Sequence, residues 1–392
     1  MSRPVAEAAS GPAHAGTDAG GAAPTWAVVA GGGTAGHVVP AIAAALALVE
    51  GGRSPATIHF VGAARGPEAQ LVPAAGFTIT LLPGRGIARR LTPANVQAAF
   101  GLARALLRAV ALVARRRPAV VLSVGGYASV PCSVAAAVLR VPIVVHEQNA
   151  VPGLANRMVA RFARASAVSF EGTALPRPVV TGNPVRPEVL AVERSPDARA
   201  SARRELQLPH DATVVAVFGG SLGARRINQA AFGLVRAWER RSGIAVRHAV
   251  GTRDWAEVRA DLPRPPPGGL VYQAVEYEDR MPLLLSAADV AVCRAGGSTV
   301  AELAAVGLPA VLVPLPIAPH DHQTANARRL VEQGGAVMVP DGELTAERLA
   351  AELDRLLDDP GRLEALGRAV RQGARRDAAR RLAELVEKHA RR

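Results

Sequence analysis

A glycine pair followed by two hydroxyl side chains and a carboxylate stands at residues 294–302, in the order Arg-Ala-Gly-Gly-Ser-Thr-Val-Ala-Glu. Two glycines let a bulky group lie against the backbone, and the N–H groups of a first helical turn favour an anion. Glu302 would then accept hydrogen bonds from the ribose hydroxyls of a nucleotide. Thr299 and Glu302 also have the spacing of a capping box, in which Glu302 would only cap the helix. The stretch predicts either a nucleotide site or a capped helix start.

The segments on both sides supply the elements that would hold these residues. Asp289 to Cys293 is a short apolar run of the length expected for a buried parallel strand, and Leu308 to Val313 is another. Between them a helix follows the glycine pair and stops at Gly307. Strand, turn, helix and strand form one βαβ unit, with room for a ligand at the turn.

A second glycine loop, Gly31 to His37, follows the first predicted strand, Thr25 to Ala30. It fits the G-x-G-x-x-G pattern of dinucleotide-binding loops, and an apolar helix, Val38 to Glu50, comes after it. A nicotinamide site would place an acidic residue at the end of the next strand, Ile58 to Val61. The segment Gly62 to Arg65 supplies none, which argues against a dehydrogenase.

The same order of strand and glycine turn occurs twice more. Val120 to Val124 precedes Gly125-Gly126-Tyr127, and Thr213 to Phe218 precedes the loop Gly219 to Asn228. The chain therefore predicts an α/β protein with two Rossmann-like, doubly wound domains whose loops face one cleft.

The predicted parts of the chain follow from these repeats and from composition. They are a disordered tail at 1–24, a first domain at 25–185, a linker at 186–208, a second domain at 209–365 and a C-terminal helix at 366–392 that packs back on the first domain.

Composition limits the partners and the compartment. The net charge is +13, and almost all of the positive charge is arginine, which favours an anionic partner. Cys132 and Cys293 both lie in apolar segments and have no disulfide or zinc spacing, and a reducing cytoplasm fits them. No apolar run approaches the length of a membrane span.

Residues 87–117 combine an apolar helical stripe with arginine-rich ends, including Arg89 and Arg90. One interpretation is an ordinary surface helix packed on its own sheet. The other is a peripheral docking surface for an anionic bilayer. The arginine-rich C-terminal helix has no interleaved aromatic residues, so we expect no nucleic-acid binding from it.

Two local patterns suggest other chemistry. Gly219-x-Ser221-x-Gly223 has the form of a nucleophile elbow, with Asp289 and His322 downstream in the order of a hydrolase. An early oxyanion loop is missing, so a phosphate-binding loop is the simpler interpretation. The run 320–322, His-Asp-His, lacks a third spaced ligand for a metal.

Taken together, the motifs resemble those of the MurG family of bacterial glycosyltransferases in order and spacing, from about Trp26 to the C-terminal helix. The matching motifs are Gly32–Pro40, Gly125–Tyr127, His146–Asn149, Thr181–Arg186, Gly219–Ala224, Arg294–Gly297 with Glu302, and Asp321–Ala327.

The resemblance implies a GT-B fold without a metal cofactor. It also implies transfer of N-acetylglucosamine from UDP-GlcNAc, with inversion, to the C4 hydroxyl of the lipid-linked muramoyl pentapeptide (lipid I). The product would be lipid II, made by a peripheral protein at the cytoplasmic, anionic face of the cell membrane, among cell-wall synthesis and division proteins. The alternative is a GT-B transferase with another lipid acceptor, such as diacylglycerol.

The resemblance also implies roles for single residues. In the second domain, Ser221 would bind the donor diphosphate, Glu302 the ribose and the backbone near Glu278 the uracil. The remaining donor residues would be Gly297, Ser298 and Thr299 at the wall of the site, and Gln323, Arg186 and Asn149 around the sugar.

In the first domain, Thr34, Ala35 and Gly36 would take the acceptor diphosphate. His37 is the predicted general base, with a phosphate hydrogen bond or a loop cap as the alternative role. His146 and Glu147 are the alternative base or a pair that positions lipid I. Ala35 stands where the family has glycine, so we expect it to restrict left-handed backbone angles.

Overall fold

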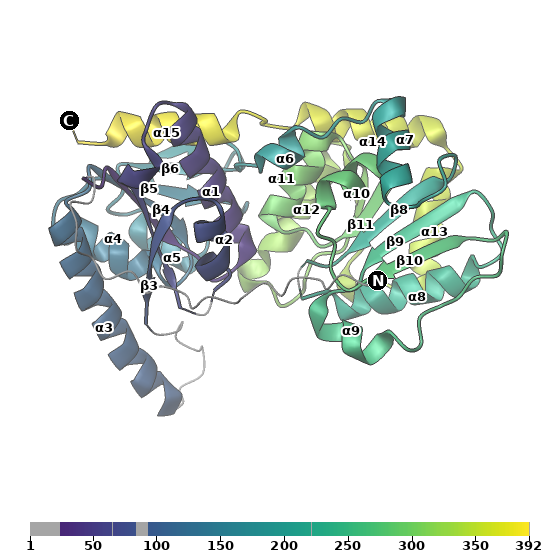
Figure 1. The fold of residues 1–392 in the computed structure, drawn as a ribbon, viewed down its shortest axis with the longest axis horizontal. Coiled ribbons are helices and arrows are strands. Elements are labelled where there is room, and N and C mark those ends of the chain that lie inside the picture. The colour runs from purple at the N-terminus through teal and green to yellow at the C-terminus, as the bar shows by residue number, and fades with distance from the viewer. Residues whose placement is uncertain (1–23, 65, 84–92, 221, 392) are drawn as a thin grey trace, which may run out of the picture.

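The chain of 392 residues is described by a computed structural model that covers residues 24–64, 66–83, 93–220 and 222–391, with only the backbone of residues 93–100. Two lobes stand side by side, the first coloured purple to blue and the second green in Figure 1. The tail predicted at 1–24 lies almost wholly outside the described residues. No helix in the described part of the chain is long and apolar enough to cross a membrane.

The first lobe contains a parallel sheet with the strand order β3-β2-β1-β4-β5-β6-β7. Its strands are β1 (Ala27–Gly31), β2 (Ile58–Ala63), β3 (Thr78–Leu82), β4 (Val120–Gly125), β5 (Ile143–Glu147), β6 (Ala165–Val168) and β7 (Pro178–Val180). The winding reverses between β1 and β4, so the loops after these two strands diverge and leave a crevice.

The second lobe repeats this arrangement with the order β10-β9-β8-β11-β12-β13. Its strands are β8 (Thr213–Phe218), β9 (Ile244–Ala249), β10 (Val271–Val275), β11 (Val290–Cys293), β12 (Ala310–Leu312) and β13 (Ala336–Met338). The corresponding reversal lies between β8 and β11, which pair in parallel with Phe218 beside Cys293. The glycine turns after these two strands are therefore neighbours at one sheet edge.

Helices cover both faces of each sheet, and this explains why the strands are apolar on both sides. Each sheet accordingly has two clusters of buried side chains, one on each face. The helices are α1 (Ala35–Glu50), α2 (Glu68–Ala74), α3 (Pro93–Arg116), α4 (Ser129–Val138), α5 (Leu154–Val159), α6 (Pro187–Leu190), α7 (Pro196–Glu205), α8 (Arg225–Ala237), α9 (Thr252–Val258), α10 (Met281–Ala287), α11 (Gly297–Val306), α12 (His322–Glu332), α13 (Ala346–Leu357), α14 (Pro360–Gln372) and α15 (Ala378–His389).

The range 186–208, predicted as a linker, contains α6 and α7 and packs into the second lobe. α7 lies against α10, and Val189 and Leu206 are buried in the second core. This range is thus built into the lobe, and the chain passes between the lobes on either side of Arg186.

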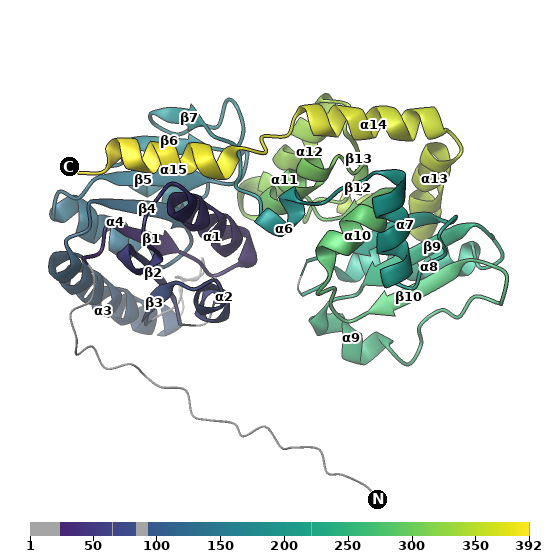
Figure 2. The ribbon, with the colours of Figure 1, turned by 45° about the horizontal axis from the view of Figure 1, so that its top comes forward.

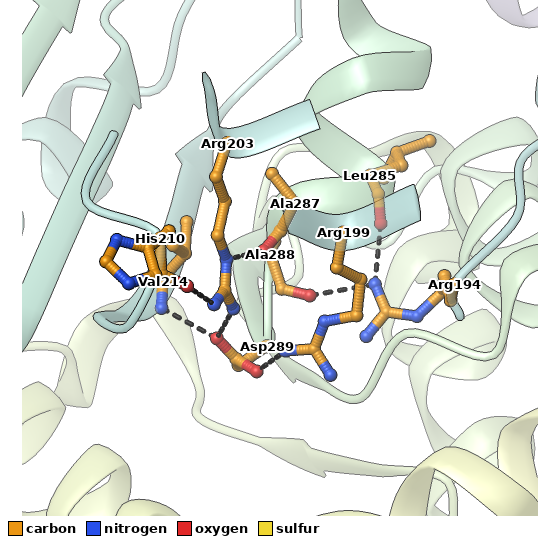
Figure 3. Close-up of polar contacts among 9 residues, drawn as sticks. All are labelled: Arg194, Arg199, Arg203, His210, Val214, Leu285, Ala287, Ala288 and Asp289. Carbon is orange, nitrogen blue, oxygen red and sulfur yellow. Dashed lines mark hydrogen bonds and ion pairs between the residues drawn. The ribbon is translucent and has the colours of Figure 1, made fainter. Parts of the chain in front are cut away.

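Arginines fasten this stretch to the amino end of β11 (Figure 3). The Asp289 carboxylate accepts hydrogen bonds from Arg199, from Arg203 and from the N–H of Val214. Arg194 donates to two backbone carbonyls at the end of α10, and burial together with neighbouring arginines lowers its pKa to about 9. One carboxylate therefore joins α7 to two strands.

The last helix, α15, returns to the first lobe, while α13 and α14 belong to the second (Figure 2). It packs against α1 and across β4, β5 and β6, and it buries Leu382 and Val386 in the first core. Glu387 accepts a hydrogen bond from Nε of Arg53 at 2.9 Å. The two lobes are therefore connected twice, before α6 and between α14 and α15.

Candidate active site

The loops after β1 and β4 form the floor of the first half of the cleft. The N–H of Gly32 donates to the carbonyl of Gly125 at 3.2 Å. A Cβ on Gly126, whose φ is +81°, would lie 2.0 Å from the carbonyl oxygen of Gly32. The two turns require glycine here because their backbones touch.

His37 lies over this contact, in the first turn of α1. Its Nδ1 is 2.8 Å from the hydroxyl of Thr34, and its Nε2 lies 3.2 Å from the point where a Cβ on Gly125 would be. The pKa of His37 is lowered to about 4, chiefly by burial and then by the charge of His322 on α12, while the charge of Glu68 acts in the opposite direction. The ring is therefore neutral at pH 7 and has one nitrogen fixed by a neighbouring hydroxyl.

Thr34, Ala35 and Gly36 lie at the amino end of α1, with Thr34 and Ala35 exposed. The N–H of His37 donates to the carbonyl of Thr34, whereas those of Ala35 and Gly36 have no acceptor within the helix and can bind an anion. Ala35 is a helical residue and is not among those with positive φ. The expectation that Ala35 would constrain the backbone was wrong, because this position does not adopt a left-handed conformation and so does not need glycine.

His146 and Glu147 are buried, at 0% and 1% exposure. His146 lies 3.2 Å from the amide of Gln148, and burial lowers its pKa to about 4. The Glu147 carboxylate accepts hydrogen bonds from the N–H groups of Asn149 and Gly153, at 3.0 Å each, and from the Asn149 and Asn156 side chains. This geometry suits residues that shape the loop after β5 better than residues that touch a substrate.

The loop after β5 carries a direct contact between the lobes. Asn149 accepts a hydrogen bond from the amide of Asn326 at 3.0 Å, and the N–H of Ala150 donates to Asn326 at 2.8 Å. A Cβ on Gly297 would lie 2.4 Å from the carbonyl oxygen of Gln148. Asn326 was not singled out by the sequence analysis, although it lies one turn after Gln323 on the same helix.

The amino end of α11 forms the facing wall of the cleft. It contains Gly297, Ser298 and Thr299, and the Ser298 hydroxyl lies 3.4 Å from the carbonyl oxygen of Gly36. The amino ends of α1 and α11 therefore meet across the cleft. Gln323 accepts hydrogen bonds from the N–H groups of Ala295 and Leu315, at 3.2 and 3.0 Å, and so joins the loops after β11 and β12.

Oε1 of Glu302 lies 2.9 Å from Nε of Arg186 in an ion pair, and Glu302 does not cap the amino end of α11. The cap position of α11 is Gly296, so the capping-box alternative was wrong. Burial raises the pKa of Glu302, while the charge and hydrogen bond of Arg186 lower it. Glu302 is a largely buried carboxylate whose partner comes from the segment between the lobes.

Two further predicted donor residues are Ser221 and Glu278. Ser221 is outside the described residues, but its loop follows β8 and is therefore next to the turn after β11. The side chain of Glu278 is buried and bonded to Arg247 at 2.5 Å, so only its backbone is suited to contact a ligand.

The alternative chemistries find no support in the geometry. Asp289 lies at the amino end of β11, opposite the sheet edge that carries the loop of Ser221, and is bonded to two arginines. A catalytic triad cannot form across the sheet. Within the described ranges, no group of three or more His, Cys, Asp or Glu side chains could hold a metal ion.

A pocket of about 550 Å³ lies between the lobes, near the two connections between them. The pocket is lined by one face of α11, the end of α12 and the turn between α14 and α15. Both amide atoms of Asn183, at its wall, are buried without a partner among the described residues. Glu302 is not among the lining residues of this pocket.

Two doubly wound lobes, with glycine turns and helix starts facing one cleft, define the GT-B class of nucleotide-sugar enzymes. The family model for the glycosyltransferase family 28 N-terminal domain matches residues 27–168, and that for the C-terminal domain matches residues 214–382. The chain belongs to this glycosyltransferase family, and the predicted fold class and the resemblance to the MurG family are confirmed.

Curated relatives agree over almost the whole chain. The chain is 40% identical over 374 residues to the UDP-N-acetylglucosamine–N-acetylmuramyl-(pentapeptide) pyrophosphoryl-undecaprenol N-acetylglucosamine transferase of Desulforudis audaxviator, covering 93% of this chain and 98% of that protein. It is 43% identical over 364 residues to the transferase of the same name from Acidothermus cellulolyticus, covering 93% and 97%.

Solved structures support the same fold. The crystal structure of Acinetobacter baumannii MurG is 29% identical, with a TM-score of 0.71 and coverage of 93% of this chain and 99% of that one. The structure of a Neisseria meningitidis UDP-GlcNAc 2-epimerase bound to UDP-GlcNAc is 13% identical, with a TM-score of 0.61. The alignment covers 93% of this chain and 99% of that one, and at this identity it shows a shared fold alone.

Proposed function

We propose that this protein transfers N-acetylglucosamine from UDP-GlcNAc to the C4 hydroxyl of lipid I, forming lipid II with inversion at the anomeric carbon. The observation that best supports the proposal is the meeting of the α1 and α11 amino ends, 3.4 Å apart at Ser298 and Gly36. Each end offers unpaired amides to a diphosphate, so one cleft can take an acceptor diphosphate and a donor diphosphate.

The donor is assigned to the second lobe. Gly297, Ser298 and Thr299, together with Ser221, would hold the diphosphate as negative charge grows on the departing UDP. Backbone amides and the helix dipole can stabilise that charge without a cation, so we expect no metal requirement. Glu302 would bind the ribose, and the backbone near Glu278 would bind the uracil.

The sugar is assigned to the space between the lobes. Gln323 is fixed by two backbone amides, and Asn149 by the opposite lobe, so both side chains are held in place at the cleft. Arg186 would lie next to the ribose through its contact with Glu302.

His37 is the general base in this proposal. The ring is half-buried in the first turn of α1, Thr34 holds Nδ1, and Nε2 has no hydrogen-bond partner among the described residues. That nitrogen can accept the proton of the C4 hydroxyl as the hydroxyl attacks the anomeric carbon. His146 and Glu147 would position the loop after β5.

A lipid-linked acceptor requires contact with a membrane, and we propose that the first lobe docks on the cytoplasmic face of the membrane. Exposed apolar side chains and exposed arginines both occur on α3, α4 and α5 and in the turns that follow α4 and α5. The apolar side chains are Leu107, Val138, Leu154, Met158 and Phe162, and the arginines are Arg104, Arg108, Arg140, Arg157, Arg161 and Arg164. The only acidic residue between 93 and 164 is the buried Glu147. Arginines beside exposed apolar groups suit an anionic bilayer. Arg89 and Arg90 lie outside the described residues.

Binding to vesicles tests this surface. We expect Phe162→Gln to weaken co-sedimentation with vesicles of 30% phosphatidylglycerol, and high salt to weaken it further. Val331→Gln, at an exposed position on α12, is the matched control and should bind as the parent does. Equal loss in both variants would contradict the assignment. Contacts with cell-wall synthesis and division proteins remain part of the proposal.

Turnover tests the reaction itself. UDP release from UDP-GlcNAc should require a soluble lipid I analogue, should persist in EDTA and should fail with diacylglycerol. His37→Ala should lower kcat with the donor by about 10²–10⁴-fold, the usual contribution of a general base. Release of UDP with diacylglycerol but not with the lipid I analogue would refute the proposed acceptor.

A further inference from the structure

Glu68 is a buried carboxylate beneath the first glycine loop, and the proposed reaction has not used it. It begins α2 and is 1% exposed. Both carboxylate oxygens lie 3.0 Å from the nitrogen of Gly33, and Oε1 also accepts a hydrogen bond from the N–H of Ala63 at 2.8 Å. In a dinucleotide-binding protein the amides of this loop face a phosphate. Here a protein carboxylate takes one of them.

Three glycines provide the space for this carboxylate. A Cβ would lie 2.2 Å from Oε1 of Glu68 at Gly32, 2.5 Å from its Cγ at Gly62 and 1.9 Å from its Oε2 at Gly66. These glycines come from three segments: the loop after β1, β2 itself, and the turn before α2. Glu68 therefore explains the need for glycine at positions 32, 62 and 66, whereas Gly31 is explained by its contact with Val124 and Gly125.

The second lobe places its corresponding acid differently. Asp254 lies on α9 after β9, as Glu68 lies on α2 after β2, and it is 2% exposed. It accepts hydrogen bonds from the amide of Asn228 at 3.0 Å and from Arg225 and Arg253. Among the described residues of the loop 219–224, none donates to it. This arrangement leaves the anion site of the second glycine loop to a ligand.

We propose that Glu68 is a positioning residue that also determines which lobe takes the nucleotide. It fills the anion site of the first glycine loop and holds Thr34–His37 at the cleft. The diphosphate of the nucleotide is thereby restricted to the second lobe. This inference rests on the proposed function, because it assigns acceptor and donor to different lobes.

The position of Glu68 also accounts for where the acceptor phosphate can lie. The N–H of Gly33 already donates to Glu68. The amides that remain for a phosphate are therefore those of Ala35 and Gly36, in the first turn of α1. These amides are on the exposed side of the loop, beside His37. A shift of the loop would move the phosphate contacts and the His37 ring together.

The matched variants Glu68→Gln and Glu50→Gln test this inference in the full-length protein. Glu50 is an exposed glutamate at the end of α1, so the control makes the same chemical change away from the loop. For Glu68→Gln we expect kcat/KM for a soluble lipid I analogue to fall about 10- to 100-fold, the effect of a small misplacement of reacting groups. The KM for UDP-GlcNAc and the Kd for UDP should stay within about twofold, as in Glu50→Gln.

The result that overturns the inference is an unchanged acceptor kcat/KM in a folded Glu68→Gln protein, or an equal loss in acceptor and UDP affinity. Failure of the proposed function would look different, because the parent itself would not turn over the lipid I analogue. In that case the number of UDP molecules bound per protein decides. One UDP site in the parent and two in Glu68→Gln would support the inference, and the same number in both proteins would refute it.

A measurement on the unaltered protein covers the case in which Glu68→Gln does not fold. In hydrogen exchange followed by NMR, the Gly33 amide should be protected, since it donates to a buried carboxylate. The Ala35 and Gly36 amides should exchange fast until the lipid I analogue is added. Fast exchange at Gly33, or protection of all three without the analogue, would refute the inference.

Discussion

The Glu302–Arg186 pair offers the most direct test of donor binding. The Glu302 side chain is 17% exposed and Nε of Arg186 lies 2.9 Å from its carboxylate. A hydrogen bond to a charged group contributes about 1.5–3 kcal/mol when its partner is desolvated. Removal of the carboxylate in Glu302→Ala should therefore raise the KM for UDP-GlcNAc and the Kd for UDP by about 10- to 150-fold. Loss of ribose hydroxyl contacts is the physical cause.

The assay separates this effect from a loss of structure. UDP binding is followed by calorimetry and donor KM by turnover, while KM for the lipid I analogue should change little. Glu193→Ala is the matched control, since Glu193 is an exposed acid shortly after the neighbouring α6. If Glu302→Ala bound UDP as the parent does, the ribose assignment would be refuted and Glu302 would serve only to pair with Arg186.

Three further results are expected. Asp289→Asn should lower the free energy of unfolding, measured by urea denaturation, by about 2–3 kcal/mol. The loss is smaller than for a fully buried ion pair because Arg199 is 28% exposed. Unchanged stability would contradict the role given to this carboxylate. Burial lowers the pKa of His146 to about 4 and of His248 to about 3, so the folded protein binds fewer protons than the unfolded chain below pH 6.5. Stability should therefore be complete above pH 6.5 and fall as the pH decreases toward 4; a Tm independent of pH over this window would refute the neutral assignments. Incubation with EDTA should leave donor turnover unchanged, and rescue of a lost activity by Mg²⁺ would show that the amides alone do not stabilise the leaving diphosphate.

Strands of continuous apolar residues made the fold predictable. The apolar runs that begin at Ile58, Val120 and Thr213 each form an interior strand of a sheet. Each strand ends within two residues of its predicted end. Glycine turns at strand ends also predicted where the cleft lies, because parallel strands bring their carboxyl ends to one edge. The edge strands β3, β7 and β13 carry weaker signals, since they are short and partly exposed.

The structural reason for each glycine could not be predicted from the sequence pattern. Gly32 and Gly126 are required by contacts with Glu68 and with a backbone carbonyl, and these partners are distant in sequence. A loop that binds a phosphate and a loop that binds a buried carboxylate need the same small residues. The pattern identified the turn correctly but left open whether its anion is a ligand or part of the protein.

The same limit applies to the polar side chains of the cleft. His37 was found because it projects from the first glycine loop, and Gln323 because it lies in the motif Asp321–Ala327 that resembles the MurG family; both lie where the lobes face each other. Asn326 and Glu68 were missed because their importance depends on tertiary partners, Asn149 and Gly33, which no local pattern reveals.

Arg186 links the proposed ribose contact, Glu302, to the segment that joins the two lobes. It lies between β7 and α6, where the chain first passes from one lobe to the other, and its only described carboxylate partner is Glu302. A ribose bound to Glu302 would compete with Arg186 for the same oxygens, so UDP would either displace the guanidinium or share the carboxylate with it. Either outcome changes a contact that holds the connecting segment to α11. If UDP binds through Glu302 as proposed, donor binding would therefore act on the segment between the lobes through this one ion pair.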